Sequence, residues 1–546
     1  MPDTVTALIA EQARRQPDAT AVIYGDRHVS YAELVALGQR AAHGLAGLGI
    51  GQGDRVALWL PNSIAYLALY LGCARLGAIA TAVNTRFRAT EVADIVARSH
   101  AKVLVMWPGF RHIDFLAILD QCDPAALNAL EALVLYDEGQ PATALPGAVG
   151  HCRHVSYDNL MAGGRMTDDR AGPEVGCNIF TTSGTTKAPK FVLHPQRSIA
   201  SHAGIVAEHF GYAASTGGLL VVLPFCGVFG FTQLMASLAA GRPTVVLNAF
   251  DAEQVVGLIG DHAIEHMNAT DDMIEAMMAV PGGSAALAGI RFIGTAAFGT
   301  DFDAFSRRAE AAGIRLCGLY GMSEVQALFA LRPPVLPFAE RIRPGGSLVA
   351  PDAAVRVRDP DSGKLLPAGE PGELELTGPS LMLGYDGNAE ATAETFTDDG
   401  YVRSGDLGML QDDRSFVFLQ RMGDVLRLGG FLVSPAEIEA HLQGHPDVAG
   451  AQVVGVPGAR GTSPVGFVTL AGACAFDEAA LRAHCQAGLA RFKVPERIFV
   501  LDEFPTTKSA NGTKIQRARL REMAVSLTAN ASGTVAGAAA GRSGQG

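Results

Sequence analysis

Short apolar runs alternate with segments of helical spacing along the N-terminal half of this sequence. Helical spacing of apolar residues marks 4–16 and 31–48, and short apolar runs occupy 56–60 and 78–83 with a helical segment between them. A strand, a helix and a second strand at this spacing are typical of a βαβ unit, in which the two strands lie parallel in one sheet. The N-terminal part is therefore predicted to be an α/β domain.

The alternation continues along the chain until a different pattern replaces it. Further apolar runs predict strands at residues 102–106, 219–223, 244–247, 264–268 and 290–294. Between 352 and 375, short strands alternate with turn signals, the clearest of which is DPDSG at 359–363. Clusters of Gly, Pro and Asp of this kind connect short strands. This stretch predicts a small β-rich subdomain.

The character of the sequence changes again after Arg421. Residues 436–442 are expected to form the start of a helix, 448–456 a strand, and 476–489 a second helix. From residue 528 the sequence is rich in Ala, Gly and Ser and poor in large apolar side chains, a composition that favours disorder. The prediction has three parts. A large N-terminal domain of parallel-sheet α/β layers with the β-rich subdomain covers 1–421, a small, mobile α+β domain covers 422–527, and a disordered tail covers 528–546.

Composition narrows the class of protein. The 546 residues are 48% hydrophobic and 18% charged, and their formal net charge is −12. A nucleic-acid-binding protein would need a basic face, so no nucleic-acid partner is expected. The eight cysteines are scattered without metal-ligand spacing, which favours a reducing cytoplasm. Pro61, Asn62 and Arg75 interrupt the most apolar stretch, 56–83, so no membrane span is expected, and no signal peptide is expected at the N-terminus.

The segment TTSGTTKAPK, residues 181–190, has the most distinctive chemistry in the chain. Its backbone N–H groups, hydroxyls and ammonium groups can surround an anion that carries several oxygens. It is not a Walker A loop, because GxxxxGK[ST] does not occur in the sequence. The alternative interpretation is a Ser/Thr-rich surface turn. The candidate anion-binding residues are Thr181, Thr182, Ser183, Gly184, Thr185, Thr186, Lys187 and Lys190.

This segment resembles the phosphate loop of the acyl-adenylate-forming superfamily, which includes acyl-CoA synthetases, firefly-luciferase-like enzymes and the adenylation domains of peptide synthetases. Further segments resemble motifs of that superfamily in the same order. They are LYGMSE at 319–324, YVRSGDLG at 401–408, QRMGDVLRLGGFLVSPAEIE at 420–439 and TKSANGTKIQR at 507–517. The resemblance covers nearly the whole chain, and it is greatest to the acyl-CoA synthetases, also called carboxylic acid–CoA ligases.

The resemblance implies a role for each matching residue. The phosphate loop would hold the β- and γ-phosphates of ATP, Glu324 would bind Mg²⁺, and Asp406 would accept hydrogen bonds from the ribose hydroxyls. Lys514 would bridge the acyl carboxylate and the α-phosphate, and it is expected to be catalytic together with Thr185 and Glu324. The remaining residues of the implied ATP site are Ala296, Ala297, Tyr320, Gly321, Met322, Ser323 and Arg421.

Several positions depart from the pattern of the superfamily. Lys187 and Phe191 stand where glycines are usual, so the loop is expected to be stiffer and more cationic. Gly227 replaces a histidine of the acid pocket, and Gly423 replaces the Asp or Lys that serves as the hinge between two domain orientations. Glycine absorbs large changes of φ and ψ, so Gly423 is still the expected hinge. The acid-pocket candidates are Gly227, Phe231, His266 and Phe298, and the CoA candidates are Gly429 and Gly430.

The resemblance implies an enzyme that activates a carboxylic acid with ATP and Mg²⁺ and transfers the acyl group to CoA. The expected acid pocket has no charged anchor beyond Asp271 and Asp272, which favours an apolar aliphatic or aryl acid. Two alternatives stay open: a stand-alone enzyme that loads a carrier-protein phosphopantetheine, and a degenerate nucleotide-binding sensor or scaffold. A luciferase-like oxygenase is less favoured. The oligomeric state also stays open, with a homodimer as one option.

Overall fold

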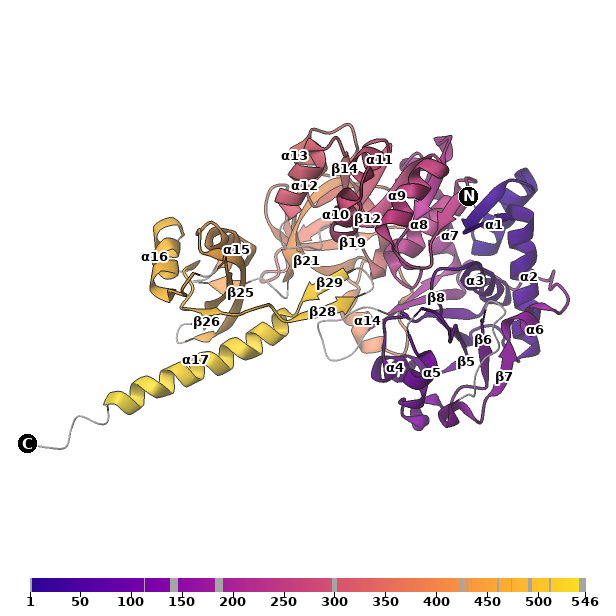
Figure 1. The fold of residues 1–546 in the computed structure, drawn as a ribbon, viewed down its shortest axis with the longest axis horizontal. Helices are drawn as coiled ribbons and strands as arrows, with labels where there is room; N and C mark the ends of the chain where they lie inside the picture. Colours follow the sequence, from indigo (N-terminus) through magenta and orange to yellow (C-terminus); the bar gives the residue numbers. More distant parts are fainter. Residues whose placement is uncertain are drawn as a thin grey trace, which may run out of the picture.

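A computed structural model gives the fold of the chain, and Figure 1 shows two large sheets with flanking helices in the N-terminal region and a separate C-terminal lobe. The structure describes residues 2–111, 113–137, 146–181, 190–296, 302–422, 426–428, 431–433, 435–458, 461–472, 474–489, 493–509 and 512–539.

The first large sheet contains the strand that leads into the phosphate loop. Its order is β20-β9-β8-β4-β3-β5-β6-β7, in which the pairs from β8 to β7 are parallel and β9 and β20 pair antiparallel. The strands are β3 Arg55–Trp59, β4 Ile79–Ala82, β5 Ala101–Met106, β6 Ala132–Leu135, β7 Arg153–Ser156, β8 Gly176–Thr181, β9 Phe191–Pro195 and β20 Gly384–Tyr385. Because β8 ends at Thr181, the phosphate loop begins at the carboxyl edge of a parallel strand, where open α/β sheets place ligands.

The second large sheet joins a parallel part to an antiparallel part. Its order is β18-β17-β19-β21-β22-β16-β15-β14-β13-β12-β10-β11-β1-β2. Strands β10 to β14 pair parallel, and the antiparallel part begins where β14 pairs with β15. The strands are β1 Thr20–Tyr24, β2 Arg27–Ser30, β10 Gly218–Val221, β11 Thr244–Val246, β12 Ile264–Thr270, β13 Phe292–Ala296, β14 Leu316–Met322, β15 Gln326–Leu331, β16 Gly345–Leu348, β17 Ala354–Arg358, β18 Leu365–Leu366, β19 Gly372–Thr377, β21 Val402–Asp412 and β22 Ser415–Arg421.

Helices cover both large sheets (Figure 1). They are α1 Val5–Arg15, α2 Tyr31–Gly47, α3 Ile64–Leu76, α4 Ala89–Ser99, α5 Phe115–Asp120, α6 Tyr157–Met161, α7 Gln196–His209, α8 Val228–Ala239, α9 Ala252–Asp261, α10 Asp271–Ala279, α11 Gly283–Ala288, α12 Phe302–Ala311, α13 Phe338–Arg341 and α14 Ala389–Thr395. The 3₁₀ turns are η1 Pro124–Leu127, η2 Gly147–Val149, η3 Tyr212–Ala214 and η4 Ser323–Val325.

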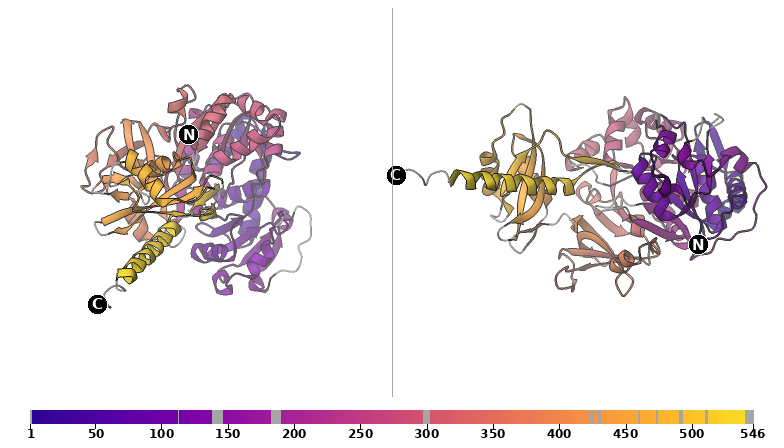
Figure 2. Two further views of the ribbon diagram at one scale, coloured as in Figure 1. Left: turned by 60° about the vertical axis from the view of Figure 1, so that its left-hand side comes forward. Right: turned by 90° about the horizontal axis from the view of Figure 1, so that it is seen from below.

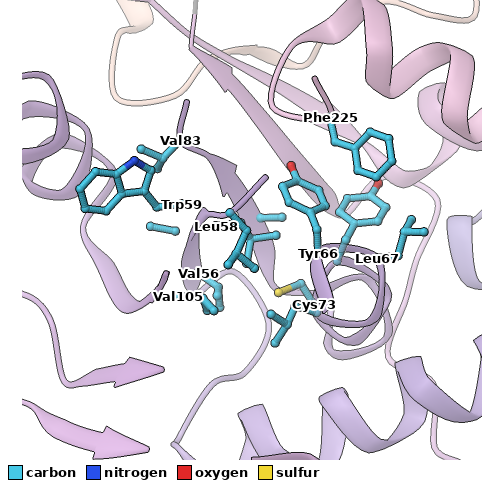
Figure 3. Packing of buried hydrophobic residues seen from close by; sticks show 14 of the residues in the cluster. Val56, Leu58, Trp59, Tyr66, Leu67, Cys73, Val83, Val105 and Phe225 are labelled. Carbon is cyan, nitrogen blue, oxygen red and sulfur yellow. The ribbon is translucent and has the colours of Figure 1, made fainter. Parts of the chain in front are cut away.

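Helix α3 explains the apolar stretch in the N-terminal region. Every residue of α3 is buried, and the helix begins where the Ser63 hydroxyl accepts a hydrogen bond from the Tyr66 N–H at 3.1 Å. Figure 3 shows the packing around it, with Tyr66 from α3 beside Phe225 and with Leu58 and Trp59 from β3. The apolar stretch is therefore the centre of a core that lies between a sheet and its helices.

The C-terminal lobe contains small sheets and three helices among its described residues. Its strands pair as β23–β24, β25–β26–β27 and β28–β29, with bounds β23 Leu426–Leu428, β24 Phe431–Val433, β25 Val448–Gly458, β26 Gly461–Leu470, β27 Arg497–Val500, β28 Thr506–Ser509 and β29 Gly512–Ile515. Its helices are α15 Pro435–Gln443, α16 Glu478–Gly488 and α17 Arg517–Ala539. Figure 1 and the right-hand view of Figure 2 show the β28–β29 hairpin reaching from the lobe toward the N-terminal region.

The structure confirms the predicted fold class of α/β layers, an antiparallel β-rich part and a small α+β lobe. It differs at the tail, which was expected to be disordered from residue 528, because α17 continues to Ala539. Alanine has the highest helix propensity, so an alanine-rich segment can extend a helix that the lobe has already started.

Among the described residues, no helix combines the length and the apolar character that crossing a bilayer requires.

Candidate active site

Asp406 lies buried at the centre of a polar corner in the second sheet. Its strand pairs with β22 so that Asp406 is directly opposite Arg421, and the Arg421 Nε atom lies 3.0 Å from Asp406 Oδ1. The Tyr320 hydroxyl donates to Asp406 Oδ2 at 2.6 Å. Strands β21 and β14 are not neighbours in the sheet order, so the sheet must curl to bring these side chains together. The corner joins the motifs LYGMSE, SGDLG and QRMGD in space.

The SGD sequence determines how Asp406 enters this corner. Gly405 adopts φ 66°, a left-handed conformation that glycine tolerates without a Cβ penalty. The Ser404 hydroxyl donates to Leu374 O at 2.6 Å and accepts from the Asp406 N–H at 3.0 Å. These contacts lie at a bulge of β21 opposite β19, and the Asp406 side chain is buried there.

Burial raises the pKa of Asp406, whereas the Arg421 charge and the Tyr320 hydroxyl oppose that rise. The negative charges of Glu324 and Glu373 contribute to the rise. Burial and the Asp406 charge also raise the pKa of the Tyr320 phenol, so this hydroxyl stays protonated and donates. Asp406 is thus a carboxylate whose two oxygens are held in fixed directions.

Glu324 is placed by the tight connection between β14 and β15. Gly321 is required there, because a Cβ atom on it would lie 2.6 Å from the Ala327 Cα atom of the returning strand. The Glu324 side chain is buried, and the Tyr385 hydroxyl donates to its Oε1 atom at 2.8 Å. Lys190 donates to the same tyrosine hydroxyl at 3.3 Å. The end of the phosphate loop and the LYGMSE motif are therefore connected through one tyrosine.

The backbone after Glu324 is strained. Gln326 and Leu328 have φ values of 61° and 63°, which non-glycine residues rarely adopt. Such residues cost on the order of 1–3 kcal/mol each and persist where the surroundings hold them in place. Backbone strain of this kind often occurs at functional sites.

Two buried histidines hold the strained segment from the side of β9 and α7. His194 Nε2 lies 2.7 Å from Ser323 O, and His202 Nε2 lies 2.8 Å from Ala327 O. The Gln326 side chain donates to Ser198 O at 2.9 Å. Since a backbone carbonyl only accepts, both Nε2 atoms must carry the proton. Burial lowers the pKa of each histidine to about 4, so both rings are neutral donors near pH 7.

The structure does not bring every acid-pocket candidate to this corner. Phe231 is buried against Tyr70 and Phe180, at centroid distances of 5.0 and 5.3 Å, so it supports the core beneath β8. His266 is buried beside Tyr212 at 5.1 Å and lies well before the carboxyl end of β12. Gly227 caps the start of α8.

The remaining predicted residues divide into described and undescribed ones. Thr181 and Ala296 lie at the carboxyl ends of β8 and β13, and Lys514 lies in β29 opposite Thr507. Met322 ends β14 and pairs with Gln326. The predicted site residues outside the described part of the chain are Thr182, Ser183, Gly184, Thr185, Thr186, Lys187, Ala297, Phe298, Gly423, Gly429 and Gly430.

Sequence reasoning missed Tyr385 as a contact of Glu324. Tyr385 follows a glycine in a strand of two residues, and neither feature signals a contact with Glu324. His194 lies in β9 and His202 in α7, and their sequence spacing carries no periodic signal that could have paired them.

Comparison with known proteins covers both regions of the chain. The AMP-binding enzyme family matches residues 9–386, and the AMP-binding enzyme C-terminal domain matches residues 437–511. The chain is 30% identical to the sulfoacetate–CoA ligase of Cupriavidus necator over 95% of this chain and 97% of that protein. It is 28% identical to 4-coumarate–CoA ligase 5 of Oryza sativa subsp. japonica over 90% and 89%. The ATP-bound crystal structure of MatB from Rhodopseudomonas palustris matches with a TM-score of 0.79 at 25% identity, over 96% of this chain and 99% of that one.

Proposed function

Since this chain belongs to the AMP-binding enzyme family, we propose that it is an AMP-forming acid–CoA ligase that acts on an apolar aliphatic or aryl carboxylic acid. In the first half-reaction a carboxylate oxygen of the acid attacks the α-phosphorus of ATP, and pyrophosphate leaves. In the second, the CoA thiol loses its proton, its sulfur attacks the acyl carbonyl, and AMP leaves as the acyl C–O bond breaks.

The observation that carries this proposal is the corner formed by Asp406, Tyr320, Arg421 and Glu324. A buried carboxylate with two directed oxygens suits the two hydroxyls of a ribose, and it needs no reorganisation when the nucleotide arrives. Tyr320 and Arg421 would then border the nucleoside, and Ser323 would face the α-phosphate. The loop from Thr181 to Lys190 would hold the β- and γ-phosphates.

Glu324 fits the role of a magnesium ligand. Mg²⁺ prefers oxygen ligands and is usually held by one or two carboxylates together with substrate phosphates and water. Among the described residues no cluster of His, Cys, Asp and Glu suffices to hold a metal alone, so the phosphates would complete the coordination. When bound, Mg²⁺ offsets the negative charge of the phosphates. The chain's own contribution is to hold the Glu324 carboxylate in place through Tyr385.

Lys514 is the proposed catalytic residue of the first half-reaction. Its ammonium group would lie between the acyl carboxylate and the α-phosphate and reduce their repulsion. The C-terminal lobe would then turn about Gly423, withdraw Lys514 and bring Gly429 and Gly430 to the site for CoA. The start of α17 ties Lys514 to this lobe, because Arg517 forms an ion pair with Glu439 of α15 at 2.8 Å.

An apolar acid is supported by the residues around the start of α8. Phe225 and Phe229 are buried there, so the surroundings are aromatic. The Asp271 carboxylate accepts from the Asp272 N–H at 3.1 Å, and both belong to the first turn of α10. Relatives named for acids as different as sulfoacetate and 4-coumarate leave the acid itself open.

A reducing compartment such as the cytoplasm is supported by the free state of all eight cysteines.

The test is a panel of aliphatic and aryl acids incubated with Mg·ATP and either free CoA or a holo-carrier protein. AMP, pyrophosphate and the thioester are measured together. We expect AMP and acyl-CoA in equal amounts with at least one apolar acid. A thioester that forms only on the carrier would favour the carrier-loading alternative, and nucleotide binding without turnover of any acid would favour the sensor.

A further inference from the structure

The Tyr385 hydroxyl lies between the two charged groups that connect the phosphate loop to the LYGMSE motif. It donates to Glu324 Oε1 at 2.8 Å and accepts from Lys190 Nζ at 3.3 Å. The Lys190 ammonium also lies 4.4 Å from the centroid of the tyrosine ring. One residue therefore contacts the proposed magnesium ligand by its hydroxyl and the lysine that ends the phosphate loop by both hydroxyl and ring.

The backbone on both sides of Tyr385 is anchored to β9. Leu383 N–H donates to Leu193 O at 2.8 Å, and Asp386 N–H donates to Phe191 O at 2.8 Å. The Tyr385 N–H donates to the Thr392 hydroxyl at 2.9 Å. Because Phe191 directly follows Lys190, the tyrosine and the end of the phosphate loop share one rigid attachment.

The proton of the Tyr385 hydroxyl has a definite direction. A tyrosine phenol is protonated near pH 7, so the Tyr385 hydroxyl has one proton to donate. Its single proton is donated to Glu324, and its lone pairs accept from Lys190 at 3.3 Å and from the Thr395 hydroxyl at 3.5 Å. The Tyr385 hydroxyl therefore restrains the Glu324 carboxylate through Oε1.

We propose that Tyr385 is a positioning residue that fixes the Glu324 carboxylate for a divalent cation and holds Lys190 at the end of the phosphate loop. This inference rests on the proposed function. Tyr385 acts through the two charged groups and does not touch the reacting atoms. A tyrosine suits the task because its ring is rigid, its hydroxyl serves both neighbours, and it brings no charge of its own.

Tyr385→Phe tests this role, because phenylalanine keeps the ring beneath Lys190 and removes only the hydroxyl. Loss of a hydrogen bond to a charged group typically costs about tenfold or more in affinity. We expect the Mg²⁺ concentration for half-maximal velocity and the KM for ATP each to rise roughly tenfold, with the KM values for acid and CoA unchanged. Tyr401→Phe is the matched control, because Arg356 lies over the Tyr401 ring at 3.8 Å in the β-rich part of the second sheet.

A double-mutant cycle with Glu324→Gln separates positioning from a general loss of structure. If Tyr385 acts through Glu324, the rise in the Mg²⁺ requirement should largely disappear when Tyr385→Phe is added to Glu324→Gln. An undiminished rise in that background would overturn the inference, and so would a single variant whose Mg²⁺ and ATP dependence equals that of the wild type. The cycle also decides the case in which Tyr385→Phe lowers the melting temperature, because a loss of stability would persist beside Glu324→Gln.

Wild-type turnover in the same assay distinguishes failure of this inference from failure of the proposed function. If no acid is turned over, the proposed function fails, and calorimetry of Mg·ATP binding to the wild type and to Tyr385→Phe still tests the inference. A tenfold weaker Mg·ATP affinity supports the positioning role there, and an equal affinity contradicts it.

Discussion

The N-terminal region and the C-terminal lobe hold their charged groups in opposite ways. Asp406 is 2% exposed in its side chain, and it is held by Tyr320 and Arg421 within a sheet of many strands. Lys514 lies on a hairpin of two strands, β28 and β29, which pair only with each other among the described residues. A two-stranded hairpin has little stability of its own, so its position depends on what it is attached to.

The attachment of the hairpin is to the lobe. Arg517 begins α17 shortly after β29 and pairs with Glu439, and Leu520 and Ala524 of α17 are buried against β25 and β26. A turn of the lobe would therefore carry Lys514 with it, while Asp406 and Glu324 would stay in place. The difference suggests a division of labour in which the large region binds the nucleotide and the lobe supplies the group that must come and go.

The largest expected effect is that of Lys514→Ala on adenylation. Loss of one group that stabilises transition-state charge typically costs about a hundredfold or more. Pyrophosphate release should fall by that factor, whereas thioester formation from supplied acyl-adenylate should stay near the wild-type rate. Lys508→Ala, in the same hairpin opposite Thr513, is the control and should change pyrophosphate release far less. Equal losses in both half-reactions would contradict the assignment.

Asp406→Ala should raise the KM for ATP more than the KM for the carboxylic acid. A buried, charge-assisted hydrogen bond is worth about 1.5–3 kcal/mol, so the KM for ATP should rise by roughly one to two decades. ATP–pyrophosphate exchange at varied ATP and varied acid measures both constants. An unchanged ATP constant with a raised acid constant would place Asp406 outside the ribose site.

Gly423→Pro should impair one half-reaction selectively, by roughly tenfold, because proline fixes φ near about −65° and restricts the turn of the lobe. Each half-reaction is assayed alone, and the melting temperature is measured beside it. Wild-type rates in both half-reactions would move the hinge to another residue.

The smallest expected effect on activity near pH 7 comes from the buried histidines His194 and His202, which act on the stability of the folded chain at acid pH. The pKa values of His194 and His202 are lowered to about 4 in the folded chain, against about 6.5 when unfolded, so the unfolded chain binds more protons between these values. Stability from these groups is present above about pH 6.5 and is lost as the pH falls toward 4, on the order of 3 kcal/mol for each. Urea unfolding across this range measures the loss.

His194→Gln sharpens this prediction, because the glutamine amide can still donate to Ser323 O but does not titrate. The decrease in the free energy of unfolding at acid pH should be smaller in this variant, while its activity at neutral pH is kept. An unchanged pH profile of stability would show that His194 does not contribute.

Motifs in the sequence singled out Asp406 in SGDLG and Glu324 in LYGMSE, and the structure buries both side chains, while their roles stay predictions. Periodicity predicted most strands of the parallel sheets to within a few residues, since apolar runs bounded by turns leave few alternatives. Tyr385 was not predictable, because its contact with Glu324 depends on β20 joining the edge of β9. The helix beyond residue 528 was missed because its composition resembles that of a linker, while its alanines and the preceding helix favour continuation.

Direct binding of Mg·ATP in the absence of acid tests the division of labour most directly. Isothermal calorimetry on the wild type, Lys514→Ala and Asp406→Ala gives the three dissociation constants. If the large region alone holds the nucleotide, Lys514→Ala should keep the wild-type Kd within about twofold, and Asp406→Ala should raise it roughly ten- to a hundredfold. A Lys514→Ala variant that loses as much ATP affinity as Asp406→Ala, or an Asp406→Ala variant with wild-type affinity, would contradict the account.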